Sequence, residues 1–207
     1  MPRSPEAAAS RRDKLVKAAT QVIHWQGFAR TTLADIAKAA DVALGSVYYY
    51  FKTKEDIAVA INDRRMEFLR RILVEATEAA DPKERLEALI QLWIRDKEVD
   101  ALYGCPIGSL CYELSKQRGT LGDEAARPLR FLLQWAEAQF RELGKGDESP
   151  GLALHMVTTL QGASLVANAF NDPAVIVRET DRLADWLKGL VRARPARTRS
   201  RPAAGSR

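Results

Sequence analysis

The chain has 207 residues, 46% of them hydrophobic, and its 32 Lys and Arg outnumber 27 Asp and Glu to give a formal net charge of +5. This length suits one moderate domain or a small domain beside a larger one. It contains no run of about 18 apolar residues and no N-terminal apolar signal core, so we expect a soluble cytoplasmic protein without membrane contact. Two cysteines and two histidines provide neither a disulfide framework nor metal-ligand spacing, and we expect no cofactor or metal.

The charge is distributed unevenly along the chain. Residues 1–53 carry 8 Lys and Arg against 4 Asp and Glu, and residues 54–191 carry 18 against 23. Residues 192–207 carry six arginines and no acid. The basic ends are therefore the parts suited to binding a polyanion, while the acidic middle is not.

The first predicted helix runs from a cap at Ser10 to about Gln26, with residues 1–9 disordered before it. Its inner face has Leu15 and Ala19 at helical spacing, and Gly27 ends it. Arginines before and within its first turn either reach a polyanion as an arm or only solvate the chain end.

Residues 31–51, TTLADIAKAADVALGSVYYYF, predict two short helices joined by a tight turn. Thr32 can cap the first helix, and Asp35 three residues later completes a capping-box pattern. Asp41 interrupts the periodicity, and the second helix spans residues 44–50. This arrangement is a helix-turn-helix.

The second of these helices has outward positions that carry almost no charge, namely Leu44, Ser46, Tyr48 and Tyr49. Such a surface suits insertion among DNA base edges. Three adjacent tyrosines cannot all face a core, because successive residues are 100° apart, and this disfavours a purely structural hairpin. At residues 52–54, free N–H groups, a helix dipole and an ammonium are expected to converge on a phosphate.

This stretch resembles the TetR family of one-component transcriptional repressors over about a quarter of the chain. The matching residues are Thr32, Ile36, Ala37, Ala40, Val42, Gly45, Tyr48, Phe51 and Lys54. Two positions depart from the family pattern. Asp41 replaces the turn glycine, which the left-handed tendency of Asp tolerates, and Ala43 replaces a serine, so the recognition helix is expected to lack a side-chain cap.

The resemblance implies an all-α fold with a three-helix DNA-binding domain at residues 1–53, a helical ligand-binding and dimerisation domain at 54–191, and a disordered basic tail at 192–207. The tail either adds non-specific affinity for DNA or only solubilises the chain. The predicted DNA contacts are Thr31, Thr32, Ala43, Leu44, Ser46, Tyr48, Tyr49, Lys52 and Lys54. A homodimer would place two recognition helices ~34 Å apart on a palindromic operator in double-stranded DNA.

The body is read as helices throughout. A continuous helix over residues 54–80 would be a lever ~35–40 Å long that joins the domains, with Arg64 and Arg65 on a solvated face. Asp81 and Pro82 start the next helix. Further helices are expected to follow breaks at Gly104, Pro106 and Gly108, and then over residues 123–143, 151–170 and 173–191, with a loop at 144–150.

The resembled family forms its dimer interface from the last two helices, which predicts contacts by Met156, Leu160, Ala163, Ala167, Leu183, Trp186, Leu187 and Leu190. A mostly apolar effector pocket with a few polar groups is predicted from Trp93, Tyr103, Cys111, Tyr112, Phe131, Trp135, His155 and Asn168. Each of these can equally be ordinary core. Cys105 and Cys111 are read as small buried hydrophobes, with a redox switch as the alternative.

The predicted function is a dimeric repressor that is released from DNA when a small, largely apolar effector binds the C-terminal domain. An activator, or a ligand-independent architectural DNA-binding protein, remains the alternative. A helical enzyme is the least favoured reading, because no nucleophile elbow, phosphate loop or zinc spacing occurs in the sequence.

Overall fold

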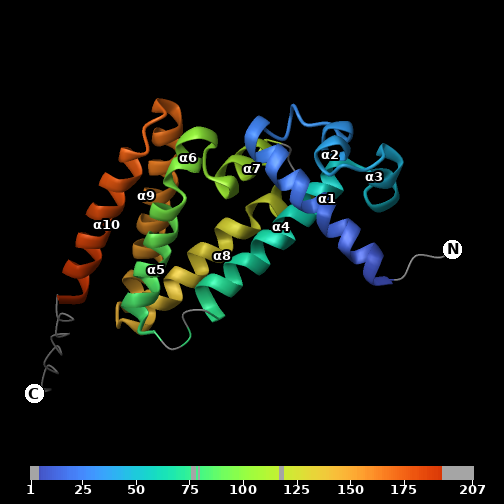
Figure 1. Cartoon of the computed structure of the whole chain (residues 1–207). Helices are drawn as coiled ribbons and strands as arrows, with labels where there is room; N and C mark the ends of the chain where they lie inside the picture. The colour runs from blue at the N-terminus through green and yellow to red at the C-terminus, as the bar shows by residue number, and fades with distance from the viewer. Residues whose placement is uncertain (1–4, 76–77, 79, 117–118, 193–207) are drawn as a thin grey trace, which may run out of the picture.

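The computed structural model describes residues 5–75, 78, 80–116 and 119–192, and these residues are helical with no strand among them. Helices α1 to α3 lie at one end of the molecule and α9 and α10 at the other, with α4 and α8 side by side between them (Figure 1). The predicted all-α class and the N-terminal helix-turn-helix are confirmed. The predicted basic tail lies almost wholly outside the described residues.

The N-terminal head consists of α1 (Pro5–Gln26), α2 (Leu33–Ala39) and α3 (Leu44–Tyr50). The cap predicted at Ser10 is wrong, because α1 begins five residues earlier and Ser10 lies inside it. The capping box of Thr32 and Asp35 is present. Asp41 adopts the expected left-handed backbone, with φ 50°.

The connecting helix α4 (Lys54–Arg70) is shorter than predicted, about 25 Å at ~1.5 Å per residue. It passes directly into η1, a π-helical turn at Arg71–Glu75. A continuous helix to Ala80 is therefore wrong. Thr53 caps α4 in a second capping box with Asp56, which fixes its start immediately after the helix-turn-helix.

The body contains α5 (Pro82–Arg95), α6 (Lys97–Tyr103), α7 (Pro106–Ser115), α8 (Thr120–Glu142), η2 (Gly146–Glu148), α9 (Ser149–Phe170) and α10 (Ala174–Arg192). Asp81 caps α5 as predicted. Helix α6 was not predicted; it ends at Gly104, whose φ of 79° suits a residue without a Cβ. Gly108 lies within α7 and does not break the chain as expected.

Helix α4 contributes buried residues to two hydrophobic clusters. Its first half contributes Ile57 and Ile61 to the head cluster, which also includes Leu110 and Leu114 of α7. Its second half contributes Leu69 to the body cluster between α5, α8, α9 and α10. A displacement of α4 within the body must therefore be transmitted to the head, since buried contacts fix it at both ends.

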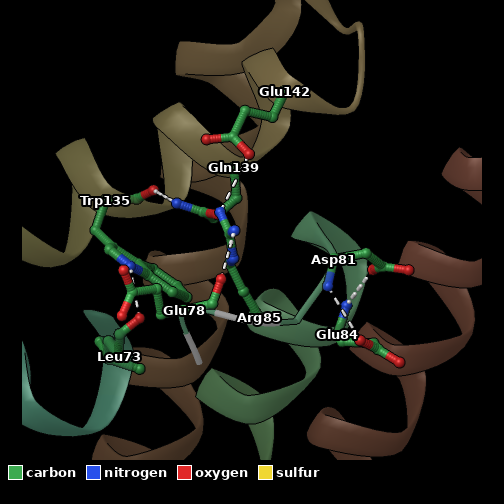
Figure 2. Close-up of polar contacts among 8 residues, drawn as sticks. All are labelled: Leu73, Glu78, Asp81, Glu84, Arg85, Trp135, Gln139 and Glu142. Carbon is green, nitrogen blue, oxygen red and sulfur yellow. Dashed lines mark hydrogen bonds and ion pairs between the residues drawn. The ribbon is translucent and has the colours of Figure 1, made fainter. Parts of the chain in front are cut away.

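Polar contacts fasten the start of α5 to α8, and α8 to η1, as Figure 2 shows. Nη1 of Arg85 donates to Gln139 Oε1 and Glu142 Oε2, each at 3.1 Å. The indole N–H of Trp135 donates to the Leu73 carbonyl at 3.0 Å. These bonds anchor the η1 turn at the far end of α4 from the head. None of the helices within the described residues is both long enough and apolar enough to cross a membrane.

Candidate nucleic-acid interface

Helix α3 exposes uncharged side chains on its outer face. Tyr48 is 48% exposed and Tyr49 is 72% exposed, while Val47 between α3 and the head core is fully buried. A Cβ added at Gly45 would meet no atom within 4 Å, so this face is open there as well. The exposed face of α3 can therefore enter a groove about 12 Å wide without bringing a negative charge to the DNA phosphates.

Most of the residues predicted to contact DNA lie on the surface of the head. The exposed ones are Thr32, Ala43, Leu44, Tyr48, Tyr49 and Lys52, and Ser46 is half-buried. As expected, α3 has no side-chain cap: Ala43 occupies the N-cap position in extended conformation. The Ala43 carbonyl accepts the Ser46 N–H at 2.8 Å, so only the backbone of the cap residue contributes to the first turn of α3.

Thr31 is a wrong prediction. It is only 1% exposed, and its hydroxyl donates to the Gly27 carbonyl at 2.7 Å. Its own N–H donates to the Phe28 carbonyl at 3.2 Å. Thr31 therefore closes the turn between α1 and α2, and only the following threonine reaches the surface.

The expected phosphate site at the start of α4 is also wrong in its details. The Asp56 carboxylate accepts the N–H groups of Lys52 and Thr53 at 3.0 and 2.9 Å. The Lys54 ammonium lies over the Phe28 ring and donates to the Phe28 carbonyl at 2.7 Å. The sequence pattern suggested that these N–H groups and this ammonium would be free to bind a phosphate. They are instead hydrogen-bonded within the head, in a capping box and a turn.

The turn that precedes the helix-turn-helix is held from both sides. Glu113, on α7 of the body, accepts the N–H groups of Phe28 and Ala29 at 3.1 and 3.0 Å. Lys54 donates to the carbonyls of the same two residues. One turn earlier, Nε2 of His24 hydrogen-bonds the Gly104 carbonyl at 2.7 Å. The orientation of the head is thus tied to the α6–α7 segment by polar contacts as well as through α4.

A partly open pocket of about 90 Å³, which we call the Arg65 pocket, lies in the body where α4, α5, α6 and α7 meet. Its lining residues are Arg65, Phe68, Leu69, Leu92, Trp93, Asp96, Asp100, Cys105, Pro106 and Ile107. The Trp93 indole donates to Ser164 Oγ at 3.0 Å, and that hydroxyl donates to Asp100 at 2.7 Å. Burial raises the pKa of Asp100 to about 6, although its bond from Ser164 opposes the shift.

The eight predicted effector contacts do not share one cavity. Trp93 lines the Arg65 pocket, whereas Cys111, Tyr112 and Asn168 line a groove of about 690 Å³ between α7 and α9. The other four lie elsewhere. Tyr103 packs on Trp25 of α1, Trp135 and Phe131 belong to the body core, and His155 contacts Trp186 of α10 edge-to-face. Periodicity located helices but could not show which aromatic positions face a void.

The residues predicted for a dimer interface point mostly into the protomer. Six are buried in its own core, namely Met156, Leu160, Ala163, Ala167, Leu183 and Leu187, and Trp186 and Leu190 pack partly against that core. Helix α9 is apolar on both sides, and the sequence analysis selected its inward side. The six buried residues are therefore not free to meet a second chain, whereas contacts by the half-buried Trp186 and Leu190 stay a prediction.

The outward side of α9 carries the exposed apolar residues instead. Leu165 is 70% and Phe170 is 73% exposed, and Leu154 and Val166 are also exposed on this helix. Large apolar side chains exposed along one helix mark an interaction surface more often than a solvent-facing one. We call Leu154, Leu165, Val166 and Phe170 the α9 outer face.

Both cysteines are free thiols, Cys105 buried and Cys111 half-buried. Burial raises the pKa of Cys105 to about 11 and also raises the pKa of Cys111. A thiol with a raised pKa is a poor nucleophile, which favours the reading of both as packing residues. Within the described part of the chain, no group of three or more His, Cys, Asp or Glu is arranged to hold a metal ion.

Two residues of consequence were missed by the sequence reasoning. Arg65 was assigned to a solvated face, yet it is only 8% exposed. It follows Ile57 and Ile61 at four-residue spacing, so the same periodicity that located the inner face could have placed it inside. Glu113 carried no such signal, because its partners are backbone N–H groups 84 and 85 residues away.

Comparison with known proteins agrees with this geometry. The family model for bacterial regulatory proteins of the tetR family matches residues 15–61. The HTH-type transcriptional regulator LmrA of Bacillus subtilis is 26% identical over 181 residues, 86% of this chain and 96% of that protein. The HTH-type transcriptional repressor DhaR of a Mycobacterium species is 27% identical over 159 residues, 76% of this chain and 77% of that protein.

The fold is shared with solved structures along nearly its whole length. A TetR-family transcriptional regulator from Agrobacterium tumefaciens superposes with a TM-score of 0.76 at 23% identity, covering 86% of this chain and 98% of that one. The matching head, the helical body and the full-length relatives agree with one another. Residues 15–61 therefore match the tetR family of bacterial regulatory proteins, and the whole chain is similar to DNA-binding transcriptional regulators and shares the fold of TetR-family structures.

Proposed function

We propose that the chain is a repressor that binds a palindromic operator as a homodimer and is released when a small effector binds in the body. The observation that carries the proposal is the exposed, uncharged face of α3, held by a buried Val47 on a head that matches the family model. The repressor DhaR, similar over most of both chains, supports repression over activation.

Dimerisation is supported by the α9 outer face. Its four apolar side chains are exposed, and α9 lies at the end of the molecule opposite the head (Figure 1). Pairing through this end would bury them and leave both heads free. A two-fold axis through such an interface relates the two α3 helices, which is the symmetry that a palindrome requires.

Effector release is supported by the position of the Arg65 pocket beside α4. Phe68 and Leu69 of α4 line it, and the same helix supplies Ile57 and Ile61 to the head core. A ligand that favours a different position of α4 would therefore change the orientation of the head. Glu113 offers a second link, since it binds the turn before α2 from the neighbouring helix α7.

The test is a selection of binding sites from random double-stranded DNA, followed by gel-shift titration of the selected sequence and of one isolated half-site. A repressor of this kind should select a palindrome and bind it much more tightly than the half-site. Binding that tracks salt concentration but shows no sequence preference would instead favour an architectural DNA-binding protein.

A further inference from the structure

Arg65 holds a buried guanidinium group whose two terminal nitrogens have no partner in the part of the chain that the structure describes. The residue is 8% exposed, and neither Nη1 nor Nη2 has a hydrogen-bond partner among the described residues. Arg85, by contrast, has its guanidinium bonded to two side chains and a carbonyl (Figure 2). A buried cation normally has its donors satisfied, so an unmatched fork of N–H groups beside a pocket indicates a site for an anion.

The acids near Arg65 do not serve as its counter-ion. Asp96 is bound by the guanidinium of Arg95 at 2.8 and 3.0 Å. Asp100 accepts the Ser164 hydroxyl at 2.7 Å. Cys105 also lies close to Arg65, but its buried thiol is protonated at neutral pH because its pKa is raised to about 11.

The remaining lining of the Arg65 pocket is mostly apolar, and the pocket is small. Its volume of about 90 Å³ leaves room for a short apolar group beside the Arg65 guanidinium. Trp93, Leu92, Ile107 and Phe68 offer no charge to a ligand body. The Arg65 pocket thus suits a molecule with one anionic end and a short hydrocarbon body, which inorganic phosphate lacks.

We propose that the effector is a short-chain aliphatic monocarboxylate whose carboxylate is bound by the Arg65 guanidinium while its hydrocarbon body packs against Trp93 and Ile107. Carboxylate and guanidinium match geometrically, because two parallel N–H groups can meet two oxygens. This inference rests on the proposed function, since it names the chemistry of the effector. It predicts that the anion binds on α4 itself, next to the α6–α7 segment.

The position of Arg65 connects this site to the head. Besides the Arg65 pocket, Arg65 borders a second groove whose other walls include Val16 and Thr20 of α1. His24, whose Nε2 hydrogen-bonds Gly104, is close enough for the charge of Arg65 to help lower its pKa, after the larger effect of burial. An anion here would be bound where α1, α4 and the α6–α7 segment meet.

The first experiment compares sodium butyrate with butyramide, at equal concentration and at an ionic strength matched with sodium chloride. Butyramide keeps the hydrocarbon chain of butyrate but lacks its negative charge. Butyrate should raise the melting temperature in a concentration-dependent way and weaken operator binding by at least about tenfold at saturation. An equal response to butyramide or to phosphate, or no response to butyrate, would overturn the assignment.

The second experiment uses Arg65→Met, with Arg64→Met, an exposed neighbour on the same helix, as its control. Arg65→Met should fold with an unchanged or higher melting temperature, because it removes an unpartnered charge, and should lose the butyrate response. Arg64→Met should keep that response. A butyrate response retained by Arg65→Met would contradict the proposal.

Should Arg65→Met fail to fold, Arg65→Lys replaces it in the same titration. A lysine keeps the charge without the planar fork, so butyrate should bind it about tenfold more weakly than it binds the wild type. Unchanged butyrate affinity in Arg65→Lys would contradict the role of the planar Arg65 guanidinium. Operator binding by the ligand-free wild type is measured separately, so failure of the effector assignment is distinguishable from failure of the DNA-binding proposal.

Discussion

The carboxylate of Glu113 accepts the backbone N–H of Phe28 at 3.1 Å, across 85 residues of sequence. One partner lies on α7 in the body and the other in the turn that leads into the helix-turn-helix. The contact fixes the head relative to α7, the helix whose Pro106 and Ile107 line the Arg65 pocket. It is therefore a direct structural route between the proposed effector site and the DNA-binding surface.

Glu113→Gln should weaken this route. A glutamine has one acceptor oxygen, so one of the two N–H groups now bound at Phe28 and Ala29 loses its partner. We expect the free energy of unfolding to fall by about 1–2 kcal/mol. Urea unfolding measures this, with the exposed Glu98→Gln as control. Equal stability of the two variants would mean that the Glu113 contacts contribute nothing.

Phe170→Glu should disrupt the homodimer. The phenyl ring is 73% exposed on the α9 outer face, and a carboxylate buried there against the same residue of a second copy would be unpaired. We expect the dimer dissociation constant to rise by at least about a hundredfold. Light scattering over a dilution series measures this.

Val74→Glu is the matched control for that experiment, since Val74 is an exposed apolar residue on η1, remote in sequence from α9. It should leave the dimer intact. A dimer that survives Phe170→Glu would place the interface on a different surface.

Asp100 should make stability depend on pH. Its pKa is raised from 3.8 to about 6, chiefly by burial. Between these two pH values the folded chain therefore holds a proton that the unfolded chain has released, and this stabilising contribution is lost as pH rises through about 6. Asp100→Asn, which keeps an acceptor for Ser164, should be more stable than the wild type at pH 7 by about 3 kcal/mol.

Urea unfolding of both proteins between about pH 4 and pH 7 checks the sign of this effect. The stability difference between variant and wild type should grow as the pH rises. The exposed Asp181→Asn serves as control and should follow the wild type. A constant difference for Asp100→Asn at all pH values would show that Asp100 has an ordinary pKa.

The thiols should react slowly in the folded protein. Cys105 is buried, and burial raises the pKa of both cysteines. A thiol reagent at neutral pH should therefore modify Cys105 only on unfolding and Cys111 more slowly than a free cysteine. Rapid modification of Cys105 in the folded chain would revive the redox-switch alternative.

Local sequence signals predicted the head well. The hydroxyl of Thr32 and the carboxylate of Asp35 need only each other to start α2, and Asp41 needs only its own backbone tolerance to end the turn. Such short-range interactions are encoded within four residues. The fold class and the exposed face of α3 could therefore be read from the sequence.

The body was harder to predict, because its site depends on which of two apolar faces turns inward. Helix α9 is apolar all round, so spacing alone could not separate Met156 in the core from Phe170 on the surface. At Arg65 two sequence signals disagreed. Helical periodicity predicted a buried position, whereas the charge of the side chain predicted an exposed one. Long-range packing decides both cases.

The most direct test of the account is operator binding by Tyr48→Ala in a gel-shift titration with the selected DNA. Tyr48 is exposed on α3, so its loss should weaken binding at least about tenfold while the protein remains folded and dimeric. Val74→Ala, exposed on η1, should bind like the wild type. Wild-type operator affinity in Tyr48→Ala would contradict the assignment of α3 as the helix that reads DNA.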